Sequence, residues 1–201
     1  MLISLRHRLV LLAQTKCAST ALAAALAPRM DIVIRGHPKA KHSNLRRFDR
    51  CLRGYCEEMA GGPVETVAMI REPVDWLRSW WRYRSRAALV GTARSTQGMS
   101  FDAFARVYLS GDGRDERVQI GRQARFLSRA DGAVGVDHLF RLEELTAMTT
   151  WLAGRTGWDV ALERRNGSPP PPGDPTLSSA TRRLAEEILA EEYRLWHEAA
   201  R

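Results

Sequence analysis

A short apolar segment that leads into a polar loop and an alanine-rich stretch constrains the fold of this chain most. Residues 8–13 (Arg-Leu-Val-Leu-Leu-Ala) have the composition of a strand covered on both faces, and residues 20–27 predict a helix. Buried-strand composition returns at residues 31–35 and 65–70, and a fourth strand is predicted at residues 136–141. Strands separated by helical segments predict an α/β fold, a parallel sheet with helices on its faces.

The remaining segments are predominantly helical. Helices are predicted over residues 44–59, 74–85, 101–109, 143–156 and 178–199. Gly61 and Gly62 end the first of them, and Ser100 is predicted to cap the third. The last helix carries one broad apolar stripe, which is predicted to pack back on the domain. Its members are Leu184, Ala185, Ile188, Leu189, Tyr193, Leu195 and Trp196.

Length and composition bound the remaining possibilities. A chain of 201 residues with 44% apolar composition predicts one domain over residues 1–201, with residues 168–175 as an extended, proline-rich surface connection. The formal net charge of +8, from 31 Lys and Arg against 23 Asp and Glu, favours an anionic partner. No apolar run near the start reaches the roughly 20 residues that span a bilayer, and a cytoplasmic protein without a transmembrane segment is expected. The three cysteines are expected to be free thiols.

The loop of residues 14–20 (Gln-Thr-Lys-Cys-Ala-Ser-Thr) has the composition of an anion site. It joins a buried strand to a helix start, where several amide N–H groups lack intrahelical partners and the helix dipole is positive. Small residues allow a phosphate to approach the backbone, and Lys16 adds a full charge. The competing interpretation is a capped helix start with a solvated lysine. The loop contains no glycine and departs from the Walker A pattern, which disfavours a magnesium-dependent kinase or NTPase.

A second candidate anion ligand, Arg71, follows the strand predicted at residues 65–70. In an open parallel sheet, ligands bind at the carboxyl edge of the strands, so Arg71 is expected on the ligand side. Ser79 lies eight residues later, and Pro73 redirects the chain between them. The competing interpretation is that Arg71 pairs with a carboxylate. Two anion-adapted turns at one sheet edge favour a shared ligand.

These two segments resemble the nucleotide-binding motifs of sulfotransferases. Residues 16–22 are similar to the 5′-phosphosulfate-binding loop of that family, and Arg71-Glu72-Pro73 with Ser79 resembles its 3′-phosphate-binding motif. Weaker similarity continues through residues 140–145 and through Asn166 before Ser168. The chain most resembles the bacterial-type relatives of the Golgi carbohydrate sulfotransferases. It departs from the family pattern at Cys17, Ala18 and Glu72.

The resemblance implies a P-loop-like three-layer fold with a central, mainly parallel sheet, and 3′-phosphoadenosine 5′-phosphosulfate (PAPS) as sulfuryl donor without a metal. The loop residues implied to bind the donor are Lys16, Cys17, Ala18, Ser19 and Thr20. Lys16 is also implied to stabilise charge on the leaving oxygen. Arg71 and Ser79 are implied to hold the 3′-phosphate. The acceptor is an unidentified hydroxyl or amine, with carbohydrates among the candidates.

An acceptor hydroxyl needs a base, and two of the five histidines follow the second predicted strand. A histidine in the comparable region serves as base in carbohydrate sulfotransferases, and by resemblance His42 takes that role while His37 lines the acceptor pocket. The alternative for both is a surface or capping role. Arg122 and Arg125 lie in a segment that resembles Gln- and Arg-containing stretches of relatives, and are predicted to contact the acceptor.

Two other functions fit parts of the sequence. A pI near 10.1 suits a nucleic-acid-binding protein, but the basic residues are scattered and no nucleic-acid-binding motif is present. A nucleotide-binding protein that has the fold without turnover is the other alternative. The aromatic side chains of residues 76–83, interleaved with arginines, either contact the acceptor or belong to the core.

Overall fold

The computed structural model describes residues 1–162 and 173–200. The chain folds into two compact units, which are described separately below. The first unit comprises Met1–Arg71, Arg122–Arg165 and Leu195–Arg201, and the second comprises Glu72–Gly121 and Asn166–Arg194. The single domain over residues 1–201 stays a prediction.

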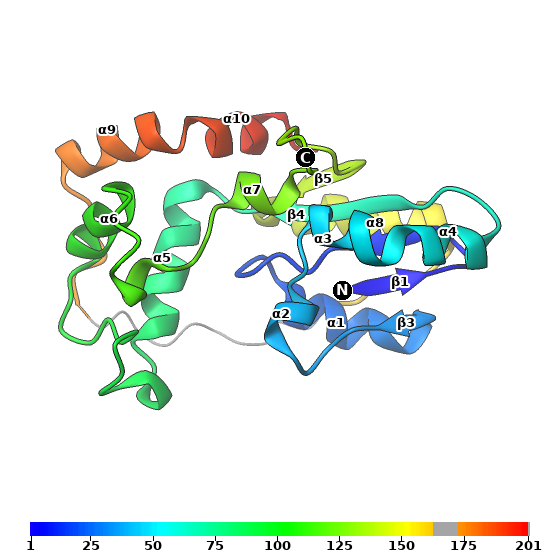
Figure 1. Ribbon diagram of the computed structural model, residues 1–201, viewed down its shortest axis with the longest axis horizontal. Helices are drawn as coiled ribbons and strands as arrows, with labels where there is room; N and C mark the ends of the chain where they lie inside the picture. The colour runs from blue at the N-terminus through cyan, green and yellow to red at the C-terminus, as the bar shows by residue number, and fades with distance from the viewer. Residues whose placement is uncertain (163–172, 201) are drawn as a thin grey trace. The chain divides into compact units, whose positions relative to one another are not determined.

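The first unit is built on a five-stranded mixed sheet (Figure 1). Its strands are β1 (Leu2–Ser4), β2 (Leu9–Leu11), β3 (Ile32–Val33), β4 (Glu65–Ile70) and β5 (His138–Arg141), in the order β3-β1-β2-β4-β5. β2, β4 and β5 pair in parallel, whereas β1 is antiparallel to both of its neighbours. The expected mainly parallel sheet is therefore corrected to a mixed one. The unexpected strand β1 precedes a turn at residues 5–8 that contains no glycine or proline, so the usual hairpin signal is missing.

The direction of the strands decides where a ligand edge can form. Because β1 runs antiparallel to both β2 and β3, those two strands run the same way, as do β4 and β5. The carboxyl ends of four strands therefore share one edge of the sheet. The segments that leave this edge include the loop after β2 and Arg71 after β4.

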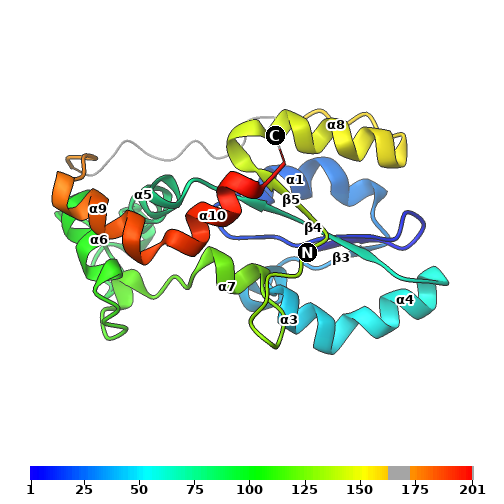
Figure 2. The ribbon, with the colours of Figure 1, turned by 90° about the horizontal axis from the view of Figure 1, so that it is seen from above.

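Helices cover both faces of the sheet, which gives the first unit its three layers. Figure 2 shows α1 (Ser19–Leu26) and α8 (Leu145–Thr156) on one face, and α3 (Leu45–Phe48) and α4 (Gly54–Ala60) on the other. On the α3 and α4 face, Val10, Ala68 and Ile70 form a buried cluster with Phe48. The period-2 alternation of the strands turns their other side chains toward α1 and α8.

The remaining helices of the first unit confirm several predicted segments. The helix expected over residues 44–59 forms as α3, a π-helical turn (Asp49–Arg53) and α4, and it ends at Gly61 with φ of 65°. Asn44 caps its start, with the side chain accepting a hydrogen bond from the Arg47 amide at 3.0 Å. Two short helices, α2 (Pro38–Lys41) and α7 (Gln123–Leu127), were not expected.

The second unit is helical and has its own buried aromatic cluster. It contains α5 (Pro73–Arg84), α6 (Phe101–Leu109) and α9 (Ser179–Ile188). Ser100 caps α6 as predicted, accepting from the Ala103 amide at 3.2 Å. Trp81 and Phe101 are fully buried with ring centroids 5.5 Å apart. The aromatic residues of α5 therefore belong in part to the core.

The C-terminal helical segment departs from the prediction of one continuous helix. It divides at Leu189 into α9 and α10 (Ala190–Glu198), and no glycine or proline marks the break. Leu184 and Ile188 are 36% and 39% exposed, so that part of the expected stripe is wrong. Other members of the predicted stripe, Ala185, Leu189 and Leu195, are buried as expected.

Candidate functional site

The loop between β2 and α1 adopts a backbone that its residue types disfavour. Lys16 has φ of 63° and Ala18 has φ of 51°, both in the left-handed region where a side chain is strained by about 1 kcal/mol or more. Ala18 occupies the N-cap position of α1, and no side chain caps the helix there. The first-turn amides of α1 are thus left for another acceptor, and an anion suits that position because of the dipole.

A buried glutamine, Gln123 on α7, joins this loop to the end of β4. Its Oε1 accepts hydrogen bonds from Gln14 Nε2 at 2.9 Å and from the Arg71 amide at 3.1 Å. Its Nε2 donates to the Arg71 carbonyl at 2.8 Å. Gln14 and Gln123 are each 2% exposed. The Gln123 side chain therefore holds together the segments that follow β2 and β4 at the shared carboxyl edge of the sheet. We call the hydrogen-bonded residues Gln14, Arg71 and Gln123 the glutamine node.

Arg71 reaches the loop with its side chain as well as its backbone. Its Nη1 donates to the Lys16 carbonyl at 3.4 Å. The backbone of Arg71 is held on both sides by Gln123, so the guanidinium is attached to a fixed point. The two segments that were expected to open on one sheet edge are in direct contact within the first unit.

Cys17 is buried beneath the loop and packs against the glutamine node. It is 2% exposed, and its Sγ lies 3.7 Å from Gln123 Oε1. Burial is the main cause that raises the pKa of the Cys17 thiol to about 12. The thiol is therefore protonated at neutral pH and is no nucleophile. The backbone of Cys17, and not its side chain, is the part that a ligand at the loop would meet.

His42 lies at the end of α2 and holds the start of the same loop. Its Nδ1 is 2.5 Å from the carbonyl oxygen of Ala13. A carbonyl oxygen only accepts, so Nδ1 carries the proton and Nε2 keeps its lone pair. Burial is the largest cause that lowers the pKa of His42 below 6.5, which favours the neutral ring. This tautomer and charge state suit a general base.

Not all predicted residues gather at the loop. Ser19 and Thr20 begin α1, Ser19 half-buried and Thr20 exposed. His37 is exposed and precedes α2, Arg122 is half-buried before α7, and Arg125 is exposed on α7. Ser79 is buried on α5 in the second unit, and its role beside Arg71 stays a prediction. Asn166 and Ser168 lie outside the described residues.

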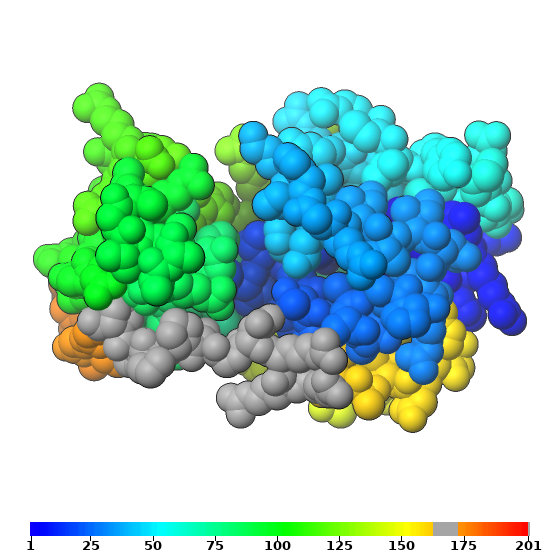
Figure 3. Space-filling view, turned by 90° about the horizontal axis from the view of Figure 1, so that it is seen from below, coloured from blue at the N-terminus to red at the C-terminus, as the bar shows by residue number. Residues whose placement is uncertain are grey.

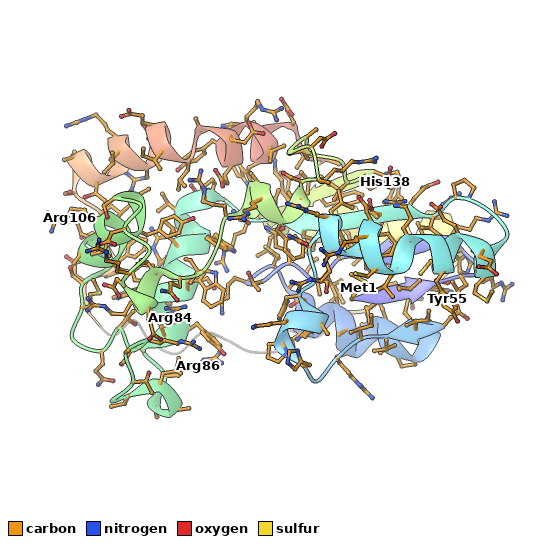
Figure 4. All side chains as sticks on the ribbon, viewed as in Figure 1. Met1, Tyr55, Arg84, Arg86, Arg106 and His138 are labelled. Atoms are coloured by element: carbon orange, nitrogen blue, oxygen red, sulfur yellow. The ribbon has the colours of Figure 1, made fainter. Side chains whose placement is uncertain are left out.

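One of the arginines of α5, Arg84, is buried and belongs neither to a solvated face nor to an acceptor groove. Arg84, which is labelled in Figure 4, is 6% exposed. Its guanidinium donates to the carbonyls of Glu116 and Gln119, the latter at 3.1 Å. Its guanidinium carbon also lies 5.5 Å from the centre of the Trp80 ring. Arg84 thus stabilises the second unit internally, because three of its contacts are to neighbouring backbone and ring atoms.

The sequence analysis did not predict that Gln14 and Gln123 position the residues of the site. Gln14 lies in the predicted anion-binding loop, and Gln123 lies between the two arginines that were predicted to contact the acceptor. The sequence signal for their role is that each glutamine is next to apolar residues, because a buried amide needs hydrogen-bond partners. Comparisons were made with family models, curated proteins and solved structures, and none of the three finds a match.

Within residues 1–162 and 173–200, no group of three or more His, Cys, Asp and Glu side chains is placed to hold a metal ion. In the same part of the chain, no helix has the length and apolar character needed to cross a bilayer.

Proposed function

We propose that the chain is a PAPS-dependent sulfotransferase with a P-loop-like fold. The observation that carries the proposal is the contact between the two anion-adapted segments: Arg71, after β4, donates to the Lys16 carbonyl in the loop after β2. The proposal also draws on the sequence resemblance of both segments to sulfotransferase motifs. A nucleotide with a 5′-phosphosulfate and a separate 3′-phosphate needs two such cationic sites.

In this proposal, residues of the first unit bind the donor nucleotide and accept the proton of the acceptor. The uncapped start of α1 and the Ser19 and Thr20 hydroxyls hold the 5′-phosphosulfate, and Lys16 neutralises the leaving oxygen. Arg71 binds the 3′-phosphate. The acceptor oxygen attacks sulfur in line as its proton passes to His42 Nε2. The bond between sulfur and the bridging oxygen breaks, and 3′-phosphoadenosine 5′-phosphate (PAP) leaves with that oxygen.

Nucleotide binding provides the first test. Calorimetric titration with PAP is expected to give saturable binding, with ATP binding at least about tenfold more weakly, because the site is built for a 3′-phosphate and lacks a Walker A loop. Equal affinity for the two nucleotides, or no binding of PAP, contradicts the proposal.

The Arg71→Ala variant tests the assignment of the 3′-phosphate site. Loss of a charge-assisted hydrogen bond is expected to weaken PAP binding roughly 10- to 100-fold and to remove the preference for PAP over 5′-AMP. The matched control is Arg46→Ala, which removes an exposed arginine of the same unit and is expected to leave both affinities unchanged. An Arg71→Ala protein that still prefers PAP over 5′-AMP shows that another group reads the 3′-phosphate.

A further inference from the structure

The first unit contains an apolar pocket of about 260 Å³ between α1 and the sheet. Its floor is a row of three side chains in direct cross-strand register, since Leu2 pairs with Leu11 on one side and with Val33 on the other. Leu22 and Ala23 of α1 form the opposite wall. Figure 3 looks onto the blue surface over α1, β3 and α2, the elements that surround this pocket.

The sequence of α1 explains why the space between helix and sheet is not filled. The helix reads Ser-Thr-Ala-Leu-Ala-Ala-Ala-Leu, and two of its alanines, Ala23 and Ala24, line the pocket. An alanine side chain ends at Cβ and cannot reach across to the floor. An apolar cavity of roughly 150 Å³ already takes up a molecule the size of benzene, so this larger pocket accommodates a short alkyl chain or an aromatic ring.

Two cations stand at the pocket: Arg35, which follows β3, and Lys41, which ends α2. Arg35 is exposed and Lys41 is half-buried. Neither side chain has a hydrogen bond or an ion pair with any other residue in the part of the chain that the structure describes. Two unneutralised cations beside an apolar wall complement a molecule with an anionic head and an apolar body.

We propose that this pocket binds a small anionic amphiphile, with its alkyl or aryl part on the Leu2, Leu11 and Val33 floor and its carboxylate or sulfate head at Arg35 and Lys41. The limited volume selects a free molecule with a short chain. Ser19 and Thr20, which are proposed to hold the 5′-phosphosulfate, also line this pocket. The inference still does not rest on the proposed sulfotransferase activity, because the floor and head-group residues are not nucleotide ligands in that proposal and the test contains no nucleotide.

Calorimetry with sodium octanoate tests the pocket. The expected result is saturable 1:1 binding with a negative heat-capacity change, and weaker binding of neutral 1-octanol. The double variant Arg35→Gln, Lys41→Gln is expected to lower the octanoate affinity about tenfold, since both head-group contacts are solvent-accessible. Ala23→Leu is expected to abolish binding, because the longer side chain occupies the pocket.

Two control variants, one for each kind of substitution, accompany this test. Ala25→Leu makes the same change on the same helix outside the pocket lining, and Arg29→Gln removes an exposed arginine that does not line it; both are expected to bind octanoate as the unaltered protein does. If Ala23→Leu fails to fold, the charge variant alone decides, because Arg35 is at the surface. The proposal is overturned if octanoate does not bind, or if it binds equally to the unaltered protein and to the charge variant.

Discussion

Replacing Gln123 by alanine is expected to lower the free energy of unfolding by about 4 kcal/mol. The change leaves Gln14 Nε2 and both backbone groups of Arg71 without their partner in a buried site. Each orphaned buried polar group contributes roughly 1–3 kcal/mol of destabilisation, and the cavity adds to it. Urea unfolding followed by circular dichroism measures the loss, and hydrogen exchange at the Arg71 amide is expected to accelerate.

Two further variants show whether the loss comes from the glutamine node. Gln119→Ala removes an exposed glutamine whose Nε2 donates to the Gly113 carbonyl at 2.8 Å, and a loss below about 1 kcal/mol is expected. Gln123→Glu keeps the acceptor oxygen but cannot donate to the Arg71 carbonyl above the carboxyl pKa, so an intermediate loss is expected. Equal stability of Gln123→Ala and Gln119→Ala would contradict the role of Gln123.

If the chain is the proposed sulfotransferase, replacing His42 by asparagine is expected to slow sulfuryl transfer by roughly 10²- to 10⁴-fold. The asparagine amide stands close to the position of Nδ1 and can still donate to the Ala13 carbonyl, whereas nothing replaces Nε2. The residues proposed to bind the nucleotide are unchanged in this variant, so PAP affinity is expected to stay within about threefold of the unaltered value. Transfer is measured as PAP formed from PAPS with a panel of sugar, phenol and alkyl alcohol acceptors.

The pH dependence and a second histidine variant separate a base from a structural histidine. Because the folded pKa of His42 is lowered below 6.5, the neutral base is the main form at pH 7, and the rate is expected to reach half of its maximum at a pH below 6.5. His37→Asn, at an exposed position, is expected to keep the full rate. A protein that loses transfer with His37→Asn and keeps it with His42→Asn reverses the two assignments.

Local signals predict most of the elements that carry the site. β4 spans Glu65–Ile70 as expected, because a short run rich in apolar and β-branched residues, bounded by Gly62-Pro63 and Pro73, favours a strand over a helix. α6 spans Phe101–Leu109 as expected, because Ser100 marks its start and its apolar residues share one face. The position of Arg71 at the carboxyl end of a strand follows from the first of these two predictions.

The features that were not predicted depend on contacts between residues distant in the sequence, or on backbone conformations that the residue types disfavour. No turn signal in the sequence marks the hairpin that reverses the chain between β1 and β2. The left-handed backbone at Lys16 and Ala18 was not predicted, because neither position is a glycine. The role of Gln123 is visible only once β2 and β4 lie side by side, since no periodicity identifies a side chain whose partners are elsewhere in the chain.

The glutamine node also determines at which stage of synthesis and folding the candidate anion site can form. Gln14 and Gln123 are 109 residues apart, and contacts between residues so distant in the sequence form more slowly in folding than local contacts do. During synthesis, the loop after β2 leaves the ribosome long before its partner exists. The candidate anion site therefore has no fixed geometry in the nascent chain, and it is assembled only after α7 has been made.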